Sequence, residues 1–212
     1  RKLERIPKRE LCLVFASQRL ADSVPYEGTV QLSPIDLDRF RPGAREWDDL
    51  RVGRMSRDER FKHGDTDPEL YRRLVEEDVA VRVRGGMCLA DELGGTRGVE
   101  LLPACPREPE RFLRELDVFF YRTSSAWFEA SARVVVEALA SGLPVVAHDR
   151  GGYVEYVHHG ENGFLFRSDE EAVEHVLALR DDPARLASMK HTARASAEAL
   201  YSADALSEIV DF

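Results

Sequence analysis

Residues 117–166 read DVFFYRTSSAWFEASARVVVEALASGLPVVAHDRGGYVEYVHHGENGFLF, and this stretch decides the fold. Its three apolar runs, at 117–121, 143–147 and 163–166, predict short buried strands. A helix is expected over 132–141, with Gly142 as the residue that ends it, and a short helix over 153–158. Strands that alternate with helices in this way indicate a parallel sheet.

The same alternation extends in both directions from this stretch. We expect further strands at 11–15, 50–55, 79–84 and 99–102, and helices at 17–23, 67–77, 108–116, 170–180, 183–200 and 203–212. Pro68 suits the first turn of its helix, and Asp67 is expected to cap it. The predicted fold class is therefore α/β, a Rossmann-like parallel sheet with helices on both faces.

Composition narrows the function classes. The net charge of −9 argues against a nucleic-acid surface, and no apolar stretch approaches the roughly 20 residues that span a bilayer. Three cysteines without a CxxC pair favour a reducing compartment, and each lies in or beside an apolar run, so we expect them to be buried. The histidines lack metal-ligand spacing, so no metal site is expected. The GxSxG, GxxxxGK[ST] and GxGxxG motifs are absent from the sequence.

Glu137 is the most informative single residue. Every position within three residues of it is apolar, which predicts a buried helix and a costly buried carboxylate. One interpretation is an internal ion pair with Arg133, four residues earlier. The other is that Glu137 lines a pocket and accepts hydrogen bonds from ligand hydroxyls, such as those of a sugar or ribose. Glu129 precedes the same helix and either faces that pocket or lies at the surface.

Two further segments could bind an anion. The strand ending at Ala147 runs into Gly151, Gly152 and a helix, so backbone N–H groups and the helix dipole would meet there; an ordinary tight turn is the alternative. Arg54 lies near the end of the strand at 50–55, and the basic residues Arg57, Arg60 and Lys62 follow it. They could neutralise a diphosphate, or they could belong to a solvated loop.

Taken together, these segments resemble the retaining glycosyltransferases with a Glu-x7-Glu signature, family 4 in the usual classification, which have the two-domain GT-B architecture. The specific match is FEASARVVVEALASGLPVVAHDRGGYVEYVHHGENGFLF, with Glu129 and Glu137 as the two motif glutamates. LDRFRPG resembles the linker between the two domains, and VGRM with Lys62 resembles the phosphate-binding arginine and lysine.

The resemblance implies a role for each matched residue. Glu137 would hold the ribose hydroxyls of a UDP- or GDP-linked sugar, and Glu129 would contact the transferred hexose. Arg54 and Lys62 would stabilise charge on the leaving diphosphate. Backbone amides at Arg133 and Val134 would also reach the phosphates. Gly151 and Gly152, in the turn after the strand at 143–147, would likewise belong to the donor-binding site. The family needs no metal and retains anomeric configuration.

The resemblance also implies a domain division. Residues 1–33 would be a remnant of the N-terminal, acceptor-side domain, 34–200 the donor-binding domain, and 201–212 a C-terminal helix. Because the acceptor site lies mostly on the N-terminal domain, we expect this chain alone to bind a donor without turning it over. The acceptor would be a glycan, a lipid-linked molecule or a small molecule, and the location cytoplasmic, including a peripheral position at the membrane.

The sequence departs from the family pattern at two places. Ser131 and Ala132 stand where an aromatic residue and a glycine are usual, and the spacing from Arg54 to Lys62 is longer than the common form. A Cβ at Ala132 could crowd the donor. Two alternatives therefore remain: a catalytically degenerate nucleotide-sugar-binding or interaction domain, and a GT-B-shaped nucleotide-sugar epimerase.

Overall fold

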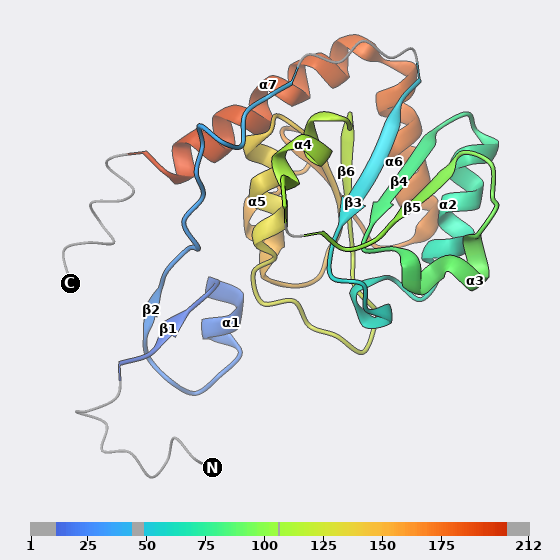
Figure 1. Ribbon diagram of the computed structural model, residues 1–212. Helices are drawn as coiled ribbons and strands as arrows, with labels where there is room; N and C mark the ends of the chain where they lie inside the picture. Colours follow the sequence, from blue (N-terminus) through green and yellow to red (C-terminus); the bar gives the residue numbers. More distant parts are fainter. Residues whose placement is uncertain (1–11, 44–48, 106, 203–212) are drawn as a thin grey trace.

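The computed structural model describes residues 12–43, 49–105 and 107–202 (Figure 1). The strands are β1 (Val14–Phe15), β2 (Thr29–Val30), β3 (Arg51–Met55), β4 (Ala80–Arg84), β5 (Val99–Leu102), β6 (Val118–Tyr121), β7 (Val145–His148) and β8 (Gly163–Phe166). The α-helices are α1 (Gln18–Asp22), α2 (Asp67–Glu76), α3 (Ala90–Leu93), α4 (Pro109–Arg114), α5 (Arg133–Ala140), α6 (Asp169–Asp181) and α7 (Pro183–Leu200). Single 3-10 turns are η3 (Arg60–Lys62), η4 (Met87–Leu89) and η5 (Gly152–Tyr156).

Six parallel strands form the main sheet in the order β5-β4-β3-β6-β7-β8. Within this sheet, the first strand in sequence is β3, at the centre. The chain then moves outward through β4 to β5, returns to the centre at β6, and moves outward on the other side through β7 to β8. This is the doubly wound order, and it places a crevice between β3 and β6 at the carboxyl edge, where loops leave in opposite directions. The predicted Rossmann-like fold is confirmed.

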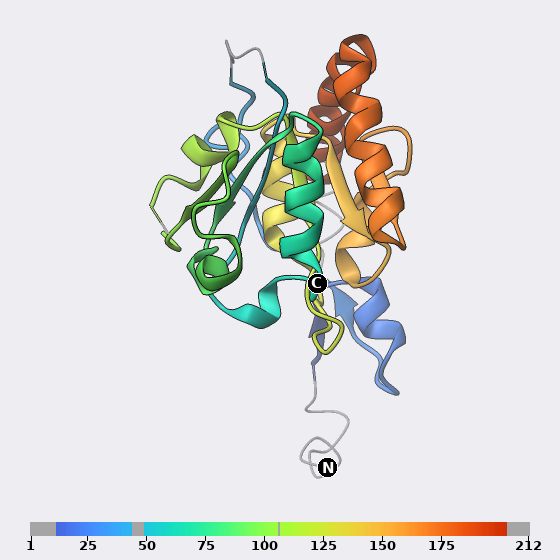
Figure 2. The same cartoon turned by 90° about the vertical axis from the view of Figure 1, so that its right-hand side faces the viewer.

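Alternate residues of the central strands enter two separate cores, one on each face of the sheet. Phe119 and Tyr121 of β6 pack with α4, α5 and α7, whereas Val118 and Phe120 pack with α2, α3 and α6. Period-two alternation of this kind requires apolar residues at every position of a strand covered on both faces. Helices therefore cover both faces of the sheet (Figures 1 and 2).

The first described segment, residues 12–33, stands beyond the carboxyl edge of the main sheet (Figures 1 and 2). It contains a separate two-stranded parallel sheet of β1 and β2, and α1 connects the two strands. Both carboxylate oxygens of Glu155 accept hydrogen bonds from the first amides of α1, at 3.1 Å from Gln18 and 2.6 Å from Arg19. This contact fixes α1 against η5.

Three local expectations need correction or fall outside the description. The cysteines are not buried: Cys12 is exposed, and Cys88 and Cys105 are half-buried, because Cys12 precedes β1, Cys88 lies in the turn η4 and Cys105 follows β5, all outside the core strands. Asp67 is the first residue of α2 and not its cap, since Thr66 occupies the capping position. The helix expected at 203–212 lies outside the described residues. The short α3 and its preceding turn η4 had no sequence signal beyond the apolar run MCLA and Leu93.

Candidate functional site

A cavity of about 550 Å³ lies at the carboxyl edge of the sheet, at the point where β3 and β6 diverge. Met55 and Tyr121, the last residues of those two strands, form its floor, and the segment 129–134 leading into α5 forms one side. Residues 56, 57 and 62 of the loop after β3 form another side. The position is where ligands bind in doubly wound sheets.

Ala132 is the N-cap residue of α5, and its backbone is in the left-handed region, at φ 53° and ψ 69°. A residue with a Cβ pays about 1–2 kcal/mol for this conformation, and glycine does not. The strain is confined to the capping position, and α5 then begins at Arg133 beside the cavity. The N-terminus of α5, with Arg133 and Val134 on the cavity wall, therefore directs partial positive charge toward the cavity.

Glu137 satisfies both interpretations of its sequence position. Its carboxylate lies 3.0 Å from Nε of Arg133, and Glu137 also lines the cavity. The Glu137 side chain is 12% exposed and that of Arg133 is 54% exposed. Burial raises the pKa of Glu137 above its usual value, and the Arg133 charge opposes part of that shift.

Lys62 and Glu129 meet on the cavity wall although they are 67 residues apart. Lys62 Nζ lies 2.5 Å from Glu129 Oε2, and the Tyr121 hydroxyl donates to the same oxygen at 3.3 Å. All three residues line the cavity. Burial raises the pKa of Tyr121, so its hydroxyl remains a neutral donor. Glu129 thus occupies the pocket and not the outer surface, which decides between the two interpretations of its position.

Gly151 and Gly152 lie behind this wall and do not line the cavity. The Gly152 amide donates to the Glu129 carbonyl oxygen at 2.9 Å, and a Cβ at residue 152 would lie 1.7 Å from the Ala130 carbonyl oxygen. Gly151 adopts φ 98°, which favours glycine. In this structure the two glycines allow the segment carrying Glu129 to approach closely. Donor binding by these glycines stays a prediction.

Arg54 is also absent from the cavity wall. Its side chain is fully buried, and Nη1 donates to Asp67 Oδ2 at 3.3 Å and to the Arg122 carbonyl oxygen at 2.8 Å. Nη2 donates to the carbonyl oxygen of Lys62. The guanidinium therefore ties together the end of β3, the loop that carries Lys62, and the loop after β6. A direct contact of Arg54 with a diphosphate stays a prediction.

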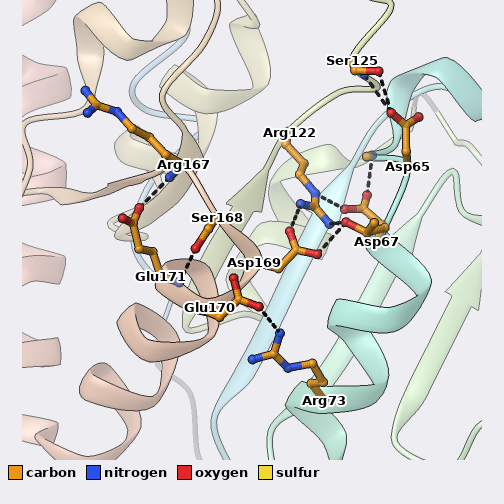
Figure 3. Close-up of polar contacts among 12 residues, drawn as sticks. Asp65, Asp67, Arg73, Arg122, Ser125, Arg167, Ser168, Asp169, Glu170 and Glu171 are labelled. Atoms are coloured by element: carbon orange, nitrogen blue, oxygen red, sulfur yellow. Dashed lines mark hydrogen bonds and ion pairs between the residues drawn. The ribbon is translucent and has the colours of Figure 1, made fainter.

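Asp67 is the centre of a buried ion network (Figure 3). Its carboxylate accepts hydrogen bonds from Arg54, from Nε of Arg122, and from the Gly64 amide at 2.8 Å. Arg122 also donates to Asp169, the first residue of α6. The network therefore connects the starts of two helices to the loop that follows β6.

His63 lies against the same network and is fully buried. Its Nε2 is 2.8 Å from the Gly85 carbonyl oxygen, so the neutral ring donates from Nε2. Burial, reinforced by the nearby Arg54 charge, lowers the pKa of His63 to about 4. The side chain is therefore neutral at physiological pH.

The structure brings Lys62, Glu129, Arg133, Val134 and Glu137 together on one cavity wall. The network of Asp67, Arg122 and Asp169 was not expected from the sequence. The interleaved charges along the chain are typical of a solvated surface, and only the three-dimensional contacts separate buried pairs from exposed ones. Arg122 had one usable signal, because it directly follows a run of buried residues at a strand end.

The described part of the chain contains neither a candidate metal cluster nor a helix that could span a membrane. Within 12–43, 49–105 and 107–202, the His, Cys, Asp and Glu side chains do not gather in groups of three or more that suit a metal ion. Within the same ranges, none of the helices has the length and apolar character needed to cross a bilayer. Metal independence of the reaction stays a prediction.

Comparison with known families and proteins gives a consistent match. Residues 71–196 match the family described as glycosyl transferases group 1. The chain is 36% identical to spore coat protein SA of Bacillus subtilis over 76 residues, which is 36% of this chain and 20% of that protein. It is 30% identical to D-inositol 3-phosphate glycosyltransferase 1 of Catenulispora acidiphila over 190 residues, 74% of this chain and 44% of that enzyme. The chain thus spans less than half the length of either relative.

Solved structures show the same fold. Anabaena HepE, determined in complex with UDP and glucose, superposes with a TM-score of 0.75 at 18% identity, over 93% of this chain and 61% of HepE. The C-terminal domain of a group 1 glycosyl transferase (LpcC) of Francisella tularensis gives a TM-score of 0.63 at 18% identity. That match covers 80% of this chain and the whole of the solved domain.

Proposed function

The chain belongs to the glycosyl transferases group 1 family, and from this membership we propose that it is the donor-binding half of a retaining, metal-independent hexosyltransferase. The donor would be a UDP- or GDP-linked sugar. The acceptor, a glycan, a lipid-linked molecule or a small molecule, would bind mainly to an N-terminal domain. By itself, this chain would bind the donor without transferring the sugar.

One observation carries the proposal: Lys62, Glu129 and Glu137 line a single cavity at the carboxyl edge, beside the N-terminus of α5. Glu137 is a nearly buried carboxylate that can accept two hydrogen bonds from vicinal ribose hydroxyls. The ammonium of Lys62 would neutralise charge that develops on the leaving diphosphate, and the helix N-terminus would add to this effect. Glu129, fixed by Lys62 and Tyr121, would contact the hexose.

The alternative of a degenerate domain rests on Ser131 and Ala132. Ala132 nevertheless adopts the left-handed conformation that a glycine would adopt at the start of α5. The backbone course toward the cavity is therefore compatible with a donor, at a cost in strain. This supports a functional donor site over a degenerate one.

The test is a calorimetric titration of the chain with UDP, GDP and their common sugar conjugates, without metal. We expect one nucleotide to bind, and we expect Glu137→Ala to weaken binding about tenfold or more because hydrogen bonds to a buried charge are lost. Glu198→Ala is the matched control, since Glu198 also pairs with an arginine four residues away but does not line the cavity. Equal affinity in the two variants would count against the proposal.

A further inference from the structure

The guanidinium of Arg54 is already engaged by other parts of the protein. All hydrogen-bond contacts that the structure gives its two Nη atoms go to protein oxygens, namely those of Asp67, Arg122 and Lys62. Its side chain is 0% exposed. Turning it toward a ligand would leave the Asp67 carboxylate buried with one cation fewer, which is costly. A role as direct ligand would therefore require the network to break.

Arg57, three residues farther along the chain, is a basic residue that does reach the cavity. Arg57 lines the 550 Å³ cavity together with Lys62, and its side chain is 64% exposed. Its ion pair is to Oε2 of Glu59, at 3.3 Å; the Glu59 side chain is 39% exposed, but the Oε2 atom itself is covered. Because the Arg57 guanidinium lies mostly in solvent, the pair is screened and contributes little free energy. The cost of changing partner is that the covered Glu59 Oε2 loses its cation.

The cations on the cavity wall differ in where their carboxylate partners lie. Lys62 is paired with Glu129 and Arg133 with Glu137, so each of these cations already meets a carboxylate of the wall. Arg57 is the wall cation whose carboxylate partner, Glu59, does not line the cavity. A guanidinium also offers two parallel donors that match a phosphate group.

We propose that Arg57 is the arginine that binds the diphosphate of the donor in this chain, and that Arg54 is a positioning residue that holds Lys62 through its carbonyl oxygen. The inference rests on the proposed function. It also gives a structural meaning to the long spacing between Arg54 and Lys62, because the additional loop residues carry a second arginine to the cavity wall.

The experiment compares Arg57→Gln with Arg111→Gln, using UDP and uridine as probes; if the wild type prefers guanine, GDP and guanosine replace them. Arg111 is a matched control, since it is 74% exposed, pairs weakly with acidic neighbours and does not line the cavity. For Arg57→Gln we expect about tenfold weaker UDP binding and unchanged uridine binding. For Arg111→Gln we expect neither affinity to change.

The positioning role of Arg54 is tested by a double-mutant cycle with Arg54→Lys and Lys62→Met, after thermal unfolding shows that each variant is folded. If Arg54 acts through Lys62, Arg54→Lys weakens UDP binding in the wild type but not in Lys62→Met. Additive losses would give Arg54 its own diphosphate contact and overturn the assignment.

The outcomes separate this inference from the proposed function. Wild-type binding of UDP or GDP with equal affinities in Arg57→Gln and Arg111→Gln would overturn the inference alone. Equal losses of UDP and uridine binding in Arg57→Gln would also overturn it, because a diphosphate contact cannot affect uridine. Failure of the wild-type chain to bind either nucleotide would overturn the proposed function, and the inference with it.

Discussion

Two groups of arginines near the loop after β3 have opposite properties. In the inner region, Arg54 of β3 and Arg122 form a network with Asp67 in which each side chain is at most 8% exposed. In the outer region, Arg57 of the loop and Arg133 at the start of α5 are more than half exposed on the cavity wall. The same type of side chain therefore fixes the backbone in one region and remains available to a ligand in the other, and burial is the property that separates the two roles.

The largest test of this comparison exchanges one arginine from each region for methionine. Arg54→Met should destabilise the chain by about 3–5 kcal/mol, because it leaves the Asp67 carboxylate with an incomplete set of buried partners. Arg57→Met should change the free energy of unfolding by no more than about 0.5 kcal/mol. Urea unfolding of both variants measures this, and equal losses would remove the distinction between the regions.

A second test uses the pH dependence of the free energy of unfolding to probe the inner region, where His63 is buried. His63 has a pKa of about 4 in the folded chain against 6.5 as its ordinary value. Because the folded pKa is the lower one, the unfolded chain binds more protons between these values, so stability is complete above pH 6.5 and falls as the pH is lowered toward 4. The expected loss is roughly 3 kcal/mol.

His63→Gln is the control for this test, because glutamine can still donate to Gly85 but does not titrate. The free energy of unfolding of His63→Gln should depend less steeply on pH between 6.5 and 4 than that of the wild type. Identical slopes in the two proteins would show that other groups cause the dependence.

The smallest expected effect is a gain of stability on the cavity side. Ala132→Gly should stabilise the chain by about 0.5–1 kcal/mol, since release of left-handed strain exceeds the added chain entropy of glycine. Ala130→Gly, two residues earlier and without positive φ, should destabilise it instead. Thermal unfolding measures both changes, and a loss of stability in Ala132→Gly would mean that Ala132 is not strained.

The fold was predictable because its signals are local. The runs that became β6, β7 and β8 are short and largely apolar, and β4 alternates valine with arginine, which is a strand pattern in itself. Among the site residues, Glu137 was found because a carboxylate inside an apolar helix is unusual, whereas Glu129 was singled out by its place before that helix and by the resemblance to the Glu-x7-Glu family. Both lie where a ligand could reach them.

The buried network was not predictable, because its members are far apart in the sequence. Asp67 and Arg122 are 55 residues apart, and Asp169 is 47 residues beyond Arg122. Asp67 and Asp169 stand next to ordinary polar residues, so nothing local separates them from solvated charges, and the one local signal of Arg122 is its position directly after a buried strand. The same limit applied to Arg54, which lies near the end of a strand next to other basic residues, and whose side chain is fully buried.

The hydrogen bond from Arg54 to the carbonyl of Lys62 has a consequence for how such a chain can change over generations. It closes the segment between Met55 and Lys62 into a ring whose base is held at both ends. Adding residues to a loop that is already closed costs only a few tenths of a kcal/mol for small changes in length. Insertions there can bring new side chains to the cavity while Lys62 stays in place, so this ring is a point at which ligand preference can diverge without a new fold.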